Sequence, residues 1–265
     1  MTTPPEPTVV LKIGGGIGRI TLNRPDRHNA FDDAVIAELA HMLDRVAADP
    51  AVRVVVLAAN GKSFSAGADL GWMKRTATYS VAENEADALV LADMLSKLNT
   101  MPKPTVALVQ GGAYGGGVGL VAACDMAIAA DNSVFCLSEV KLGLIPSVIS
   151  PYVLAAIGAR AARRYFLTAE RFDAAEAHRL GLVHDVAPAD DLAAAGDRLT
   201  DYLLAAGPAA IAKAKNLIAH VAGKPIDAAL RLETARRIAE ARASAEGQEG
   251  IAAFLERRKP DWPTD

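Results

Sequence analysis

The sequence predicts an α/β core followed by a purely helical C-terminal region. Short β-branched runs alternate with helical patterns through residues 1–145, and this alternation favours a sheet with crossover helices. From Ser147 the chain is rich in alanine and nearly all helical by pattern, and residues 190–259 are purely helical. We therefore expect a core at residues 1–189 and a helical region at residues 190–265, whose apolar stripes suit contacts between subunits.

Turn residues separate the elements along the chain. The glycine triplet at 14–16 joins two strands into a hairpin. Asp49-Pro50 ends the first long helix, because the proline ring disfavours continuation of a helix. Short runs of small and β-branched residues are typical of buried strands. The expected elements are strands 9–13, 18–22, 53–58, 105–109 and 126–130, helices 35–46, 81–98 and 117–123, and a last short strand at 182–184.

Composition and charge exclude several classes of protein. Apolar residues make up 51% of the 265, enough to bury a core, so a disordered chain is excluded. A net charge of −3 gives no basic surface for nucleic acid. The histidines are scattered and Cys124 and Cys136 form no CxxC pair, so we expect no metal site, no disulfide and a reducing, cytoplasmic location. The proline-rich start, residues 1–7, lacks the pattern of a signal or transit peptide.

One stretch without charge, residues 104–124, is long enough to cross a membrane, which takes roughly 20 apolar residues. Six of its residues are glycine, and glycine costs about 1 kcal/mol relative to alanine inside a helix. A strand, a glycine loop and a short buried helix explain this stretch better than a membrane span does.

Two glycine-bearing loops follow buried strands. The first, SFSAGADLG at residues 63–71, places small residues before a helical segment that Asp69 can cap, and the free N–H groups at a helix start are good donors to an oxyanion. The second, QGGAYGGGVG at residues 110–119, has a backbone that can approach a neighbour closely. A plain capped turn in the first loop and close structural packing in the second are the alternatives to ligand binding.

Glu139 is the third candidate feature, because its flanks are apolar. A carboxyl group in such surroundings has a raised pKa, which suits proton transfer near neutral pH. The alternative is that Glu139 faces water or pairs with Lys141. The apolar neighbours are Phe135, Cys136, Leu137, Val140, Leu142 and Leu144.

Together these features resemble the crotonase (enoyl-CoA hydratase/isomerase) superfamily, over nearly the whole chain. The resemblance implies a spiral of ββα units and a C-terminal helical region used for trimerisation, with trimers that commonly pair into hexamers. The motifs that carry it are Asn23-Arg24-Pro25, Asn29-Ala30, FSAGADL at 64–70, Gly115-Gly116-Gly117, Cys124-Asp125, Ser138-Glu139 and LGLIP at 142–146.

The resemblance also implies a site for an acyl-CoA thioester, with CoA entering as part of the substrate and no metal or other cofactor. The backbone N–H groups of Ala68 and Gly116 would form an oxyanion hole, and Glu139 would transfer protons. From a neighbouring subunit, Phe254 and Arg257 would touch the nucleotide end of CoA. The remaining residues expected along the CoA moiety are Arg27, His28, Ala66, Ala68, Asp69, Leu70 and Gly71.

One departure from the family pattern narrows the expected activity. Hydratases of this family typically carry two glutamates that share the water molecule; Glu139 matches the second, and Gly119 stands at the position of the first. Finer resemblance points to bacterial methylglutaconyl-CoA hydratases of leucine breakdown and to isohexenylglutaconyl-CoA hydratases. The expectation is hydration of a branched 2-enoyl-CoA, with 3-methylglutaconyl-CoA as the first candidate, by Glu139 alone, with Gly119 freeing space for the branched acyl group.

Three points stay open at the level of sequence. A Δ3-Δ2 enoyl-CoA isomerase would use the same single glutamate, and a non-catalytic CoA-thioester binding protein would retain the loops without turnover. The glutaconyl substrates carry a distal carboxylate that needs a cation or a hydrogen-bond donor. The candidates for that role are Lys74, Arg75, Lys141 and Tyr152.

Overall fold

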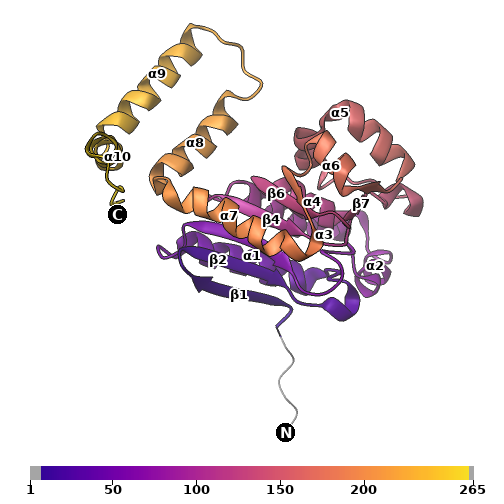
Figure 1. The fold of residues 1–265 in the computed structure, drawn as a ribbon. Helices are drawn as coiled ribbons and strands as arrows, with labels where there is room; N and C mark the ends of the chain where they lie inside the picture. The colour runs from indigo at the N-terminus through magenta and orange to yellow at the C-terminus, as the bar shows by residue number, and fades with distance from the viewer. Residues whose placement is uncertain (1–6, 263–265) are drawn as a thin grey trace.

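A six-stranded sheet forms the centre of the protein in the computed structural model, which describes residues 7–262 (Figure 1). The strand order is β1-β2-β3-β4-β6-β9, with an antiparallel β1–β2 hairpin and parallel pairing elsewhere. A second sheet of three short strands has the order β5-β7-β8. The strands are β1 Val9–Gly14, β2 Ile17–Leu22, β3 Val54–Ala59, β4 Thr105–Val109, β5 Gly112–Tyr114, β6 Met126–Ala130, β7 Val134–Cys136, β8 Phe172–Asp173 and β9 Asp185–Ala187.

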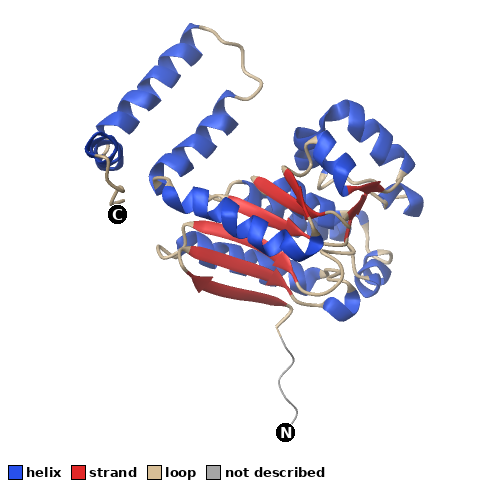
Figure 2. Ribbon diagram, viewed as in Figure 1, coloured by secondary structure: helices blue, strands red, loops and turns tan. Residues whose placement is uncertain are grey.

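Helices cover both faces of the large sheet (Figure 2). Side chains of β3 alternate between two clusters: Val55 and Leu57 belong to the core shared with α1, α3 and α4, whereas Val54 and Val56 pack toward α7. Burial on both faces explains why these strands read as continuous apolar runs. The helices of the core are α1 Asp33–Ala48, α2 Leu70–Thr76, α3 Val81–Asn99, α4 Gly116–Ala123, α5 Ser150–Thr168, α6 Ala174–Leu180 and α7 Leu192–Ala205, with the short 3-10 turns η1 Pro25–Arg27, η2 Glu139–Leu142 and η3 Ala189–Asp191.

The last three helices project from one end of the core as an arm (Figure 1). They are α8 Pro208–Val221, α9 Ala228–Ala243 and α10 Ala245–Glu256. The Lys215 ammonium on α8 lies 2.7 Å from a carboxylate oxygen of Asp125, at the end of α4. The Glu246 carboxylate on α10 accepts hydrogen bonds from the first N–H groups of α8, at Ala209 and Ala210. These contacts join the arm to the core and fix its helices to one another.

The structure confirms most of the expected elements and corrects one. The hairpin, the three buried strands and the three helices all begin and end within two residues of their predicted positions. The expected strand at 182–184 is wrong: Leu182 and Val183 are buried in a turn, and the edge strand is β9, three residues later. The strands β5, β7 and β8 escaped prediction because two or three residues carry no detectable period.

The uncharged stretch at 104–124 forms β4, β5 and α4. Within residues 7–262, no helix combines the length and the hydropathy that a membrane crossing needs. Cys124 and Cys136 are both buried and unpaired. The described part of the chain also holds no cluster of three or more side chains suited to a metal ion.

Candidate active site

The first glycine loop is held by Phe31, which forms an isolated parallel bridge with Ala68. The Phe31 N–H donates to the carbonyl of Gly67 at 2.9 Å, and the Asp69 N–H donates to the carbonyl of Phe31 at 3.0 Å. A parallel bridge of this kind bonds the two neighbours of Ala68 and leaves the N–H of Ala68 pointing the other way. Among the hydrogen bonds of the described residues, that N–H has no acceptor.

The second loop lies directly against the first. Ser65 bridges Ala113, with its N–H donating to the carbonyl of Gly112 at 3.1 Å. A Cβ atom added to Gly67 would lie 2.8 Å from the carbonyl oxygen of Tyr114 and 3.8 Å from the nitrogen of Gly116. This contact is too close for any side chain at position 67, so it brings the loop of Ala68 next to the start of α4.

The helix α4 begins with two glycines, Gly116 and Gly117, directly after Gly115, and packs tightly in several directions. A Cβ atom on Gly117 would lie 2.9 Å from the carbonyl oxygen of Ser65. On Gly116 it would lie 2.9 Å from Cε2 of Phe31 and closer still to Cζ, a spacing that real Cβ atoms essentially never show. Because Gly116 is the first residue of α4, its N–H has no partner within the helix, and no other described group accepts from it. Two free backbone donors, at Ala68 and Gly116, therefore lie on adjacent loops.

Glu139 opens η2, and its carboxylate lies beside the same helix. A Cβ atom on Gly115, the residue before Gly116, would lie 3.1 Å from Oε1 of Glu139. The other oxygen, Oε2, is buried and has no hydrogen-bond partner among the described residues. Burial raises the pKa of this carboxyl group, as its apolar flanks predicted. The ion pairs of the described chain include none to Glu139, so the alternative of a pair with Lys141 is wrong.

Gly119 lies one turn further along the same face of α4, since its N–H donates to the carbonyl of Gly115 at 3.2 Å. A Cβ atom there would lie 2.9 Å from Cβ of Ile149 and closer still to Cγ2. Ile149 is 3% exposed and precedes α5. The expectation that Gly119 frees space for a branched acyl group is therefore wrong, because the side chain of Ile149 fills that space.

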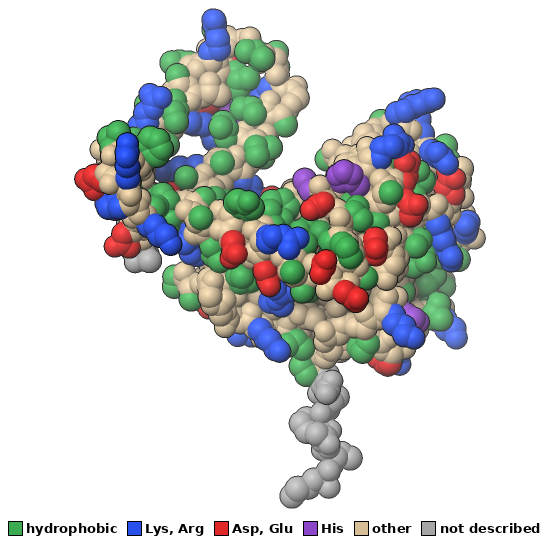
Figure 3. All heavy atoms as spheres, in the orientation of Figure 1, with side chains coloured by type: hydrophobic (Ala, Val, Ile, Leu, Met, Phe, Trp, Pro, Cys, Tyr) green, Lys and Arg blue, Asp and Glu red, His purple; other side chains and the backbone are tan. Residues whose placement is uncertain are grey.

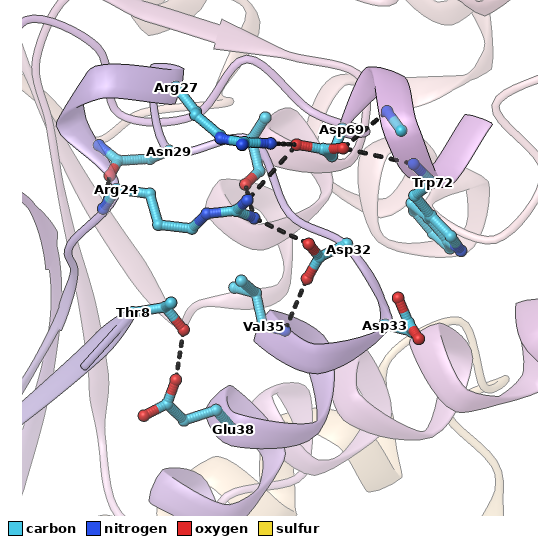
Figure 4. A network of polar contacts seen from close by, with 12 residues as sticks. Thr8, Arg24, Arg27, Asn29, Asp32, Asp33, Val35, Glu38, Asp69 and Trp72 are labelled. Carbon is cyan, nitrogen blue, oxygen red and sulfur yellow. Dashed lines mark hydrogen bonds and ion pairs between the residues drawn. The ribbon is translucent and has the colours of Figure 1, made fainter. Parts of the chain in front are cut away.

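A network of ion pairs braces the first loop (Figure 4). Arg24 donates to the carbonyl of Ala30 at 3.0 Å and lies 3.1 Å from Asp32 and 3.5 Å from Asp69. Asp69 also accepts from Arg27 at 3.2 Å, and its other oxygen caps α2 through the N–H groups of Gly71 and Trp72. Burial alone would raise the pKa of Asp69, but these hydrogen bonds and the arginine charges lower it. The loop is thus fixed on both sides of Ala68.

Known proteins that are similar to this chain identify its family. A sequence model described as enoyl-CoA hydratase/isomerase matches residues 12–265. The chain belongs to the enoyl-CoA hydratase/isomerase family. Among curated relatives, an enoyl-CoA hydratase of Alternaria alternata is 36% identical over 243 residues, which are 90% of this chain and 78% of that protein.

Solved structures of this family have the same fold. An enoyl-CoA hydratase from Shewanella pealeana is 48% identical, with a TM-score of 0.94 over 96% of each chain. The Pseudomonas aeruginosa protein AtuE is 38% identical, with a TM-score of 0.91 over 96% of this chain and 98% of its own. The expected crotonase-like α/β fold is confirmed, and the chain is an enzyme of the enoyl-CoA hydratase type.

Other residues expected along CoA lie around the braced loop. His28 and Asn29 both have positive φ angles, 51° and 53°, and the carbonyl of His28 accepts from the N–H of Ala66 at 2.8 Å. The Arg27 guanidinium is 58% exposed, so one side faces outward while the other contacts Asp69. Leu70, at the start of α2, is 75% exposed. Arg27 and His28 therefore contact the segment that contains Ala68, through Asp69 and Ala66.

The remaining predicted residues are more scattered. Phe254 is 82% exposed on α10, and Arg257 ends that helix, both on the arm. Lys74 and Lys141 are exposed, and Arg75 forms an ion pair with Asp33. The phenol of Tyr152 is half-buried and has no hydrogen-bond partner within residues 7–262, and burial raises its pKa. Sequence reasoning missed Phe31 and Ile149, because each acts through a contact with a glycine far away in the chain.

Proposed function

We propose that this protein hydrates a branched 2-enoyl-CoA that carries a distal carboxylate, with 3-methylglutaconyl-CoA of leucine breakdown as the first candidate. The observation that carries the proposal is the half-buried carboxylate of Glu139, with one buried oxygen that has no partner among the described residues, beside two free backbone donors, Ala68 and Gly116. The choice of acyl group rests on the finer sequence resemblance to glutaconyl-CoA hydratases.

The proposed reaction adds water across the C2–C3 double bond of the thioester. The N–H groups of Ala68 and Gly116 donate to the thioester oxygen and stabilise the enolate that forms when water attacks C3. Each such donor contributes about 3–4 kcal/mol in the transition state. Glu139 takes a proton from the attacking water and delivers a proton to C2, so the product gains one hydroxyl and one hydrogen. Addition of water requires no redox cofactor, and the proposed chemistry uses no metal.

Isomerisation of a 3-enoyl-CoA to a 2-enoyl-CoA is the second candidate. A single carboxylate suffices for it, because one proton leaves C2, a dienolate forms whose oxygen accepts from the same two N–H groups, and the proton returns at C4. The absence of a side chain at Gly119 is the specific observation in its favour. Incubation of each thioester with the enzyme separates the candidates, since only hydration adds the mass of one water molecule to the product.

The variant Glu139→Gln tests the role of the carboxylate. We expect turnover to fall by at least about 100-fold, the usual contribution of a general acid or base, while acyl-CoA binding persists. The exposed Glu85 on α3 provides the matched control, and Glu85→Gln retains full activity. Near-normal turnover by Glu139→Gln rejects the proposed mechanism. Tight binding without turnover of any enoyl-CoA by the unmodified protein would instead support a binding protein.

Recognition of the distal carboxylate is proposed for Lys141, Tyr152, Lys74 and Arg75. Lys141 is the first of these to test, because it lies in η2 two residues after Glu139. Arg75 is the weakest candidate, since Asp33 already pairs with its guanidinium. We expect Lys141→Ala to raise KM for 3-methylglutaconyl-CoA and to leave KM for an uncharged enoyl-CoA unchanged. If KM for 3-methylglutaconyl-CoA is unchanged in both Lys141→Ala and Arg75→Ala, neither side chain binds the distal carboxylate.

The arm is proposed as the surface that joins subunits into a trimer or hexamer. Its helices expose apolar side chains (Figure 3) beside a groove of about 410 Å³ that Ile251, Phe254 and Trp262 help to line. A second copy would cover this face and bring Phe254 and Arg257 to a neighbouring CoA. Light scattering of Phe254→Asp against the unmodified protein tests the proposal, and an unchanged mass rejects it.

The cytoplasmic location stays a prediction.

A further inference from the structure

We propose that Phe31 is a positioning residue that sets the distance between the N–H groups of Ala68 and Gly116. The inference rests on the proposed function, in which both groups donate to the thioester oxygen. Phe31 touches both donors at once, one through its backbone and the other through its ring. It therefore acts on the reaction through these donors rather than through substrate.

The backbone of Phe31 determines where the N–H of Ala68 points. Hydrogen bonds from Phe31 reach the residues on both sides of Ala68, at 2.9 and 3.0 Å, so the peptide between them cannot rotate without breaking one. Arg24 holds the two chain neighbours of Phe31 in turn, through the carbonyl of Ala30 and the carboxylate of Asp32 (Figure 4). The bridge between Phe31 and Ala68 therefore has little freedom to shift.

The ring of Phe31 determines where α4 begins. Its far edge, Cζ and Cε2, lies against Gly116 so closely that no Cβ atom fits between them. Phe31 is 3% exposed, which leaves the ring no open side toward which it could move. Because an aromatic ring is rigid and has only two side-chain torsions, the contact transmits the position of the bridge directly to Gly116.

Small displacements matter at such a site. A misplacement of about 1 Å can cost roughly 100-fold in rate, even when binding persists. Leucine at position 31 would keep both backbone hydrogen bonds and lose the ring atoms that touch Gly116. The variant Phe31→Leu thus separates the two halves of the contact.

The experiment measures kcat, KM and the carbonyl stretch of bound butyryl-CoA, labelled isotopically at its carbonyl carbon. A thioester oxygen that accepts two hydrogen bonds has a lowered carbonyl frequency. For Phe31→Leu we expect kcat to fall by about 10- to 100-fold with KM changed by less than about twofold, and a smaller lowering of the frequency. Phe31→Met has an unbranched side chain that can reach Gly116. We expect it to recover part of the lost kcat and part of the lowering of the carbonyl frequency.

Phe172→Leu is the matched control, because it makes the same change at an equally buried ring that stacks on Phe135 in the small sheet. We expect it to lower stability and to leave kcat and the carbonyl frequency unchanged. Normal kcat and frequency in Phe31→Leu overturn the inference, and so do equal losses in Phe31→Leu and Phe172→Leu. An unmodified enzyme that does not lower the carbonyl frequency rejects the proposed oxyanion donors themselves, which is a different result.

Discussion

The contact between Gly119 and Ile149 predicts a strong coupling between substitutions at the two positions. Ile149→Ala removes three buried carbon atoms and leaves a cavity, which costs about 3 kcal/mol of stability, within the usual range for such changes. Gly119→Ala forces a methyl group into Ile149, where ordinary contacts would need more than an ångström of additional space. Such overpacking costs about 1–3 kcal/mol.

The double variant should lose less stability than the sum of the two single losses. With Ile149 truncated, Cγ2 no longer blocks the methyl group introduced by Gly119→Ala and only the contact with Cβ of residue 149 remains, so the total loss falls to about 3 kcal/mol instead of about 5. A difference of 1 kcal/mol shifts Tm by about 2–4 °C in a protein of this size, so the effect is measurable. The assay is urea unfolding of the four proteins at one protein concentration, because association would make the midpoint depend on concentration.

Gly14 provides the control for this cycle. A Cβ atom at Gly14 would meet no atom of the described chain within 4 Å, so Gly14→Ala combined with Ile149→Ala should be additive within about 0.5 kcal/mol. Additive losses for the Gly119 pair as well would refute the reasoning, because they would mean that Ile149 does not occupy the space beside position 119.

Three further predictions concern charge and backbone. Glu139→Gln should be more stable than the unmodified protein near neutral pH. Because burial raises the pKa of Glu139 in the folded state, the folded protein binds the proton more tightly and loses stability as pH rises from about 4.3 through the raised pKa. Urea unfolding at several pH values should show that the extra stability of Glu139→Gln disappears in acid. Lys215→Met should cost about 1–3 kcal/mol by removing the cation beside the Asp125 carboxylate, which then keeps only its hydrogen bonds from Thr105 among the described residues, and limited proteolysis should cut the arm faster unless Asp125→Asn is added. At Asn29, where φ is 53°, glycine should be less destabilising than alanine by about 1 kcal/mol in thermal unfolding, and equal losses would contradict a backbone origin.

The sequence predicts the large sheet well because burial leaves a local trace. Both faces of β3 are covered, so the whole strand is apolar, and Asp49 and Pro50 mark the end of the helix before it. The edge strand β9 begins instead with the exposed Asp185, and the apolar residues before it are buried in a turn. Strand prediction fails there because apolar residues mark burial rather than pairing.

The candidate site divides in the same way. Glycines at 67, 115–117 and 119 are visible in the sequence, and so is the apolar setting of Glu139. The groups that occupy the space left by those glycines are not visible, because Phe31 is 85 residues from Gly116 by their numbers and Ile149 is 30 from Gly119. A missing side chain therefore indicates close approach without indicating whether the neighbour is a ligand or the protein itself.

The glycine-rich start of α4 also limits how this enzyme can diversify. Positions 115, 116, 117 and 119 each face a different neighbour, namely Glu139, Phe31, Ser65 and Ile149. A side chain at any of these four glycines requires its neighbour to move. Natural or laboratory selection for a new acyl group must therefore first alter the elements that face α4. We expect a library randomised at α4 alone to return mostly inactive proteins, whereas one that varies Ile149 together with Gly119 opens paths to new substrates.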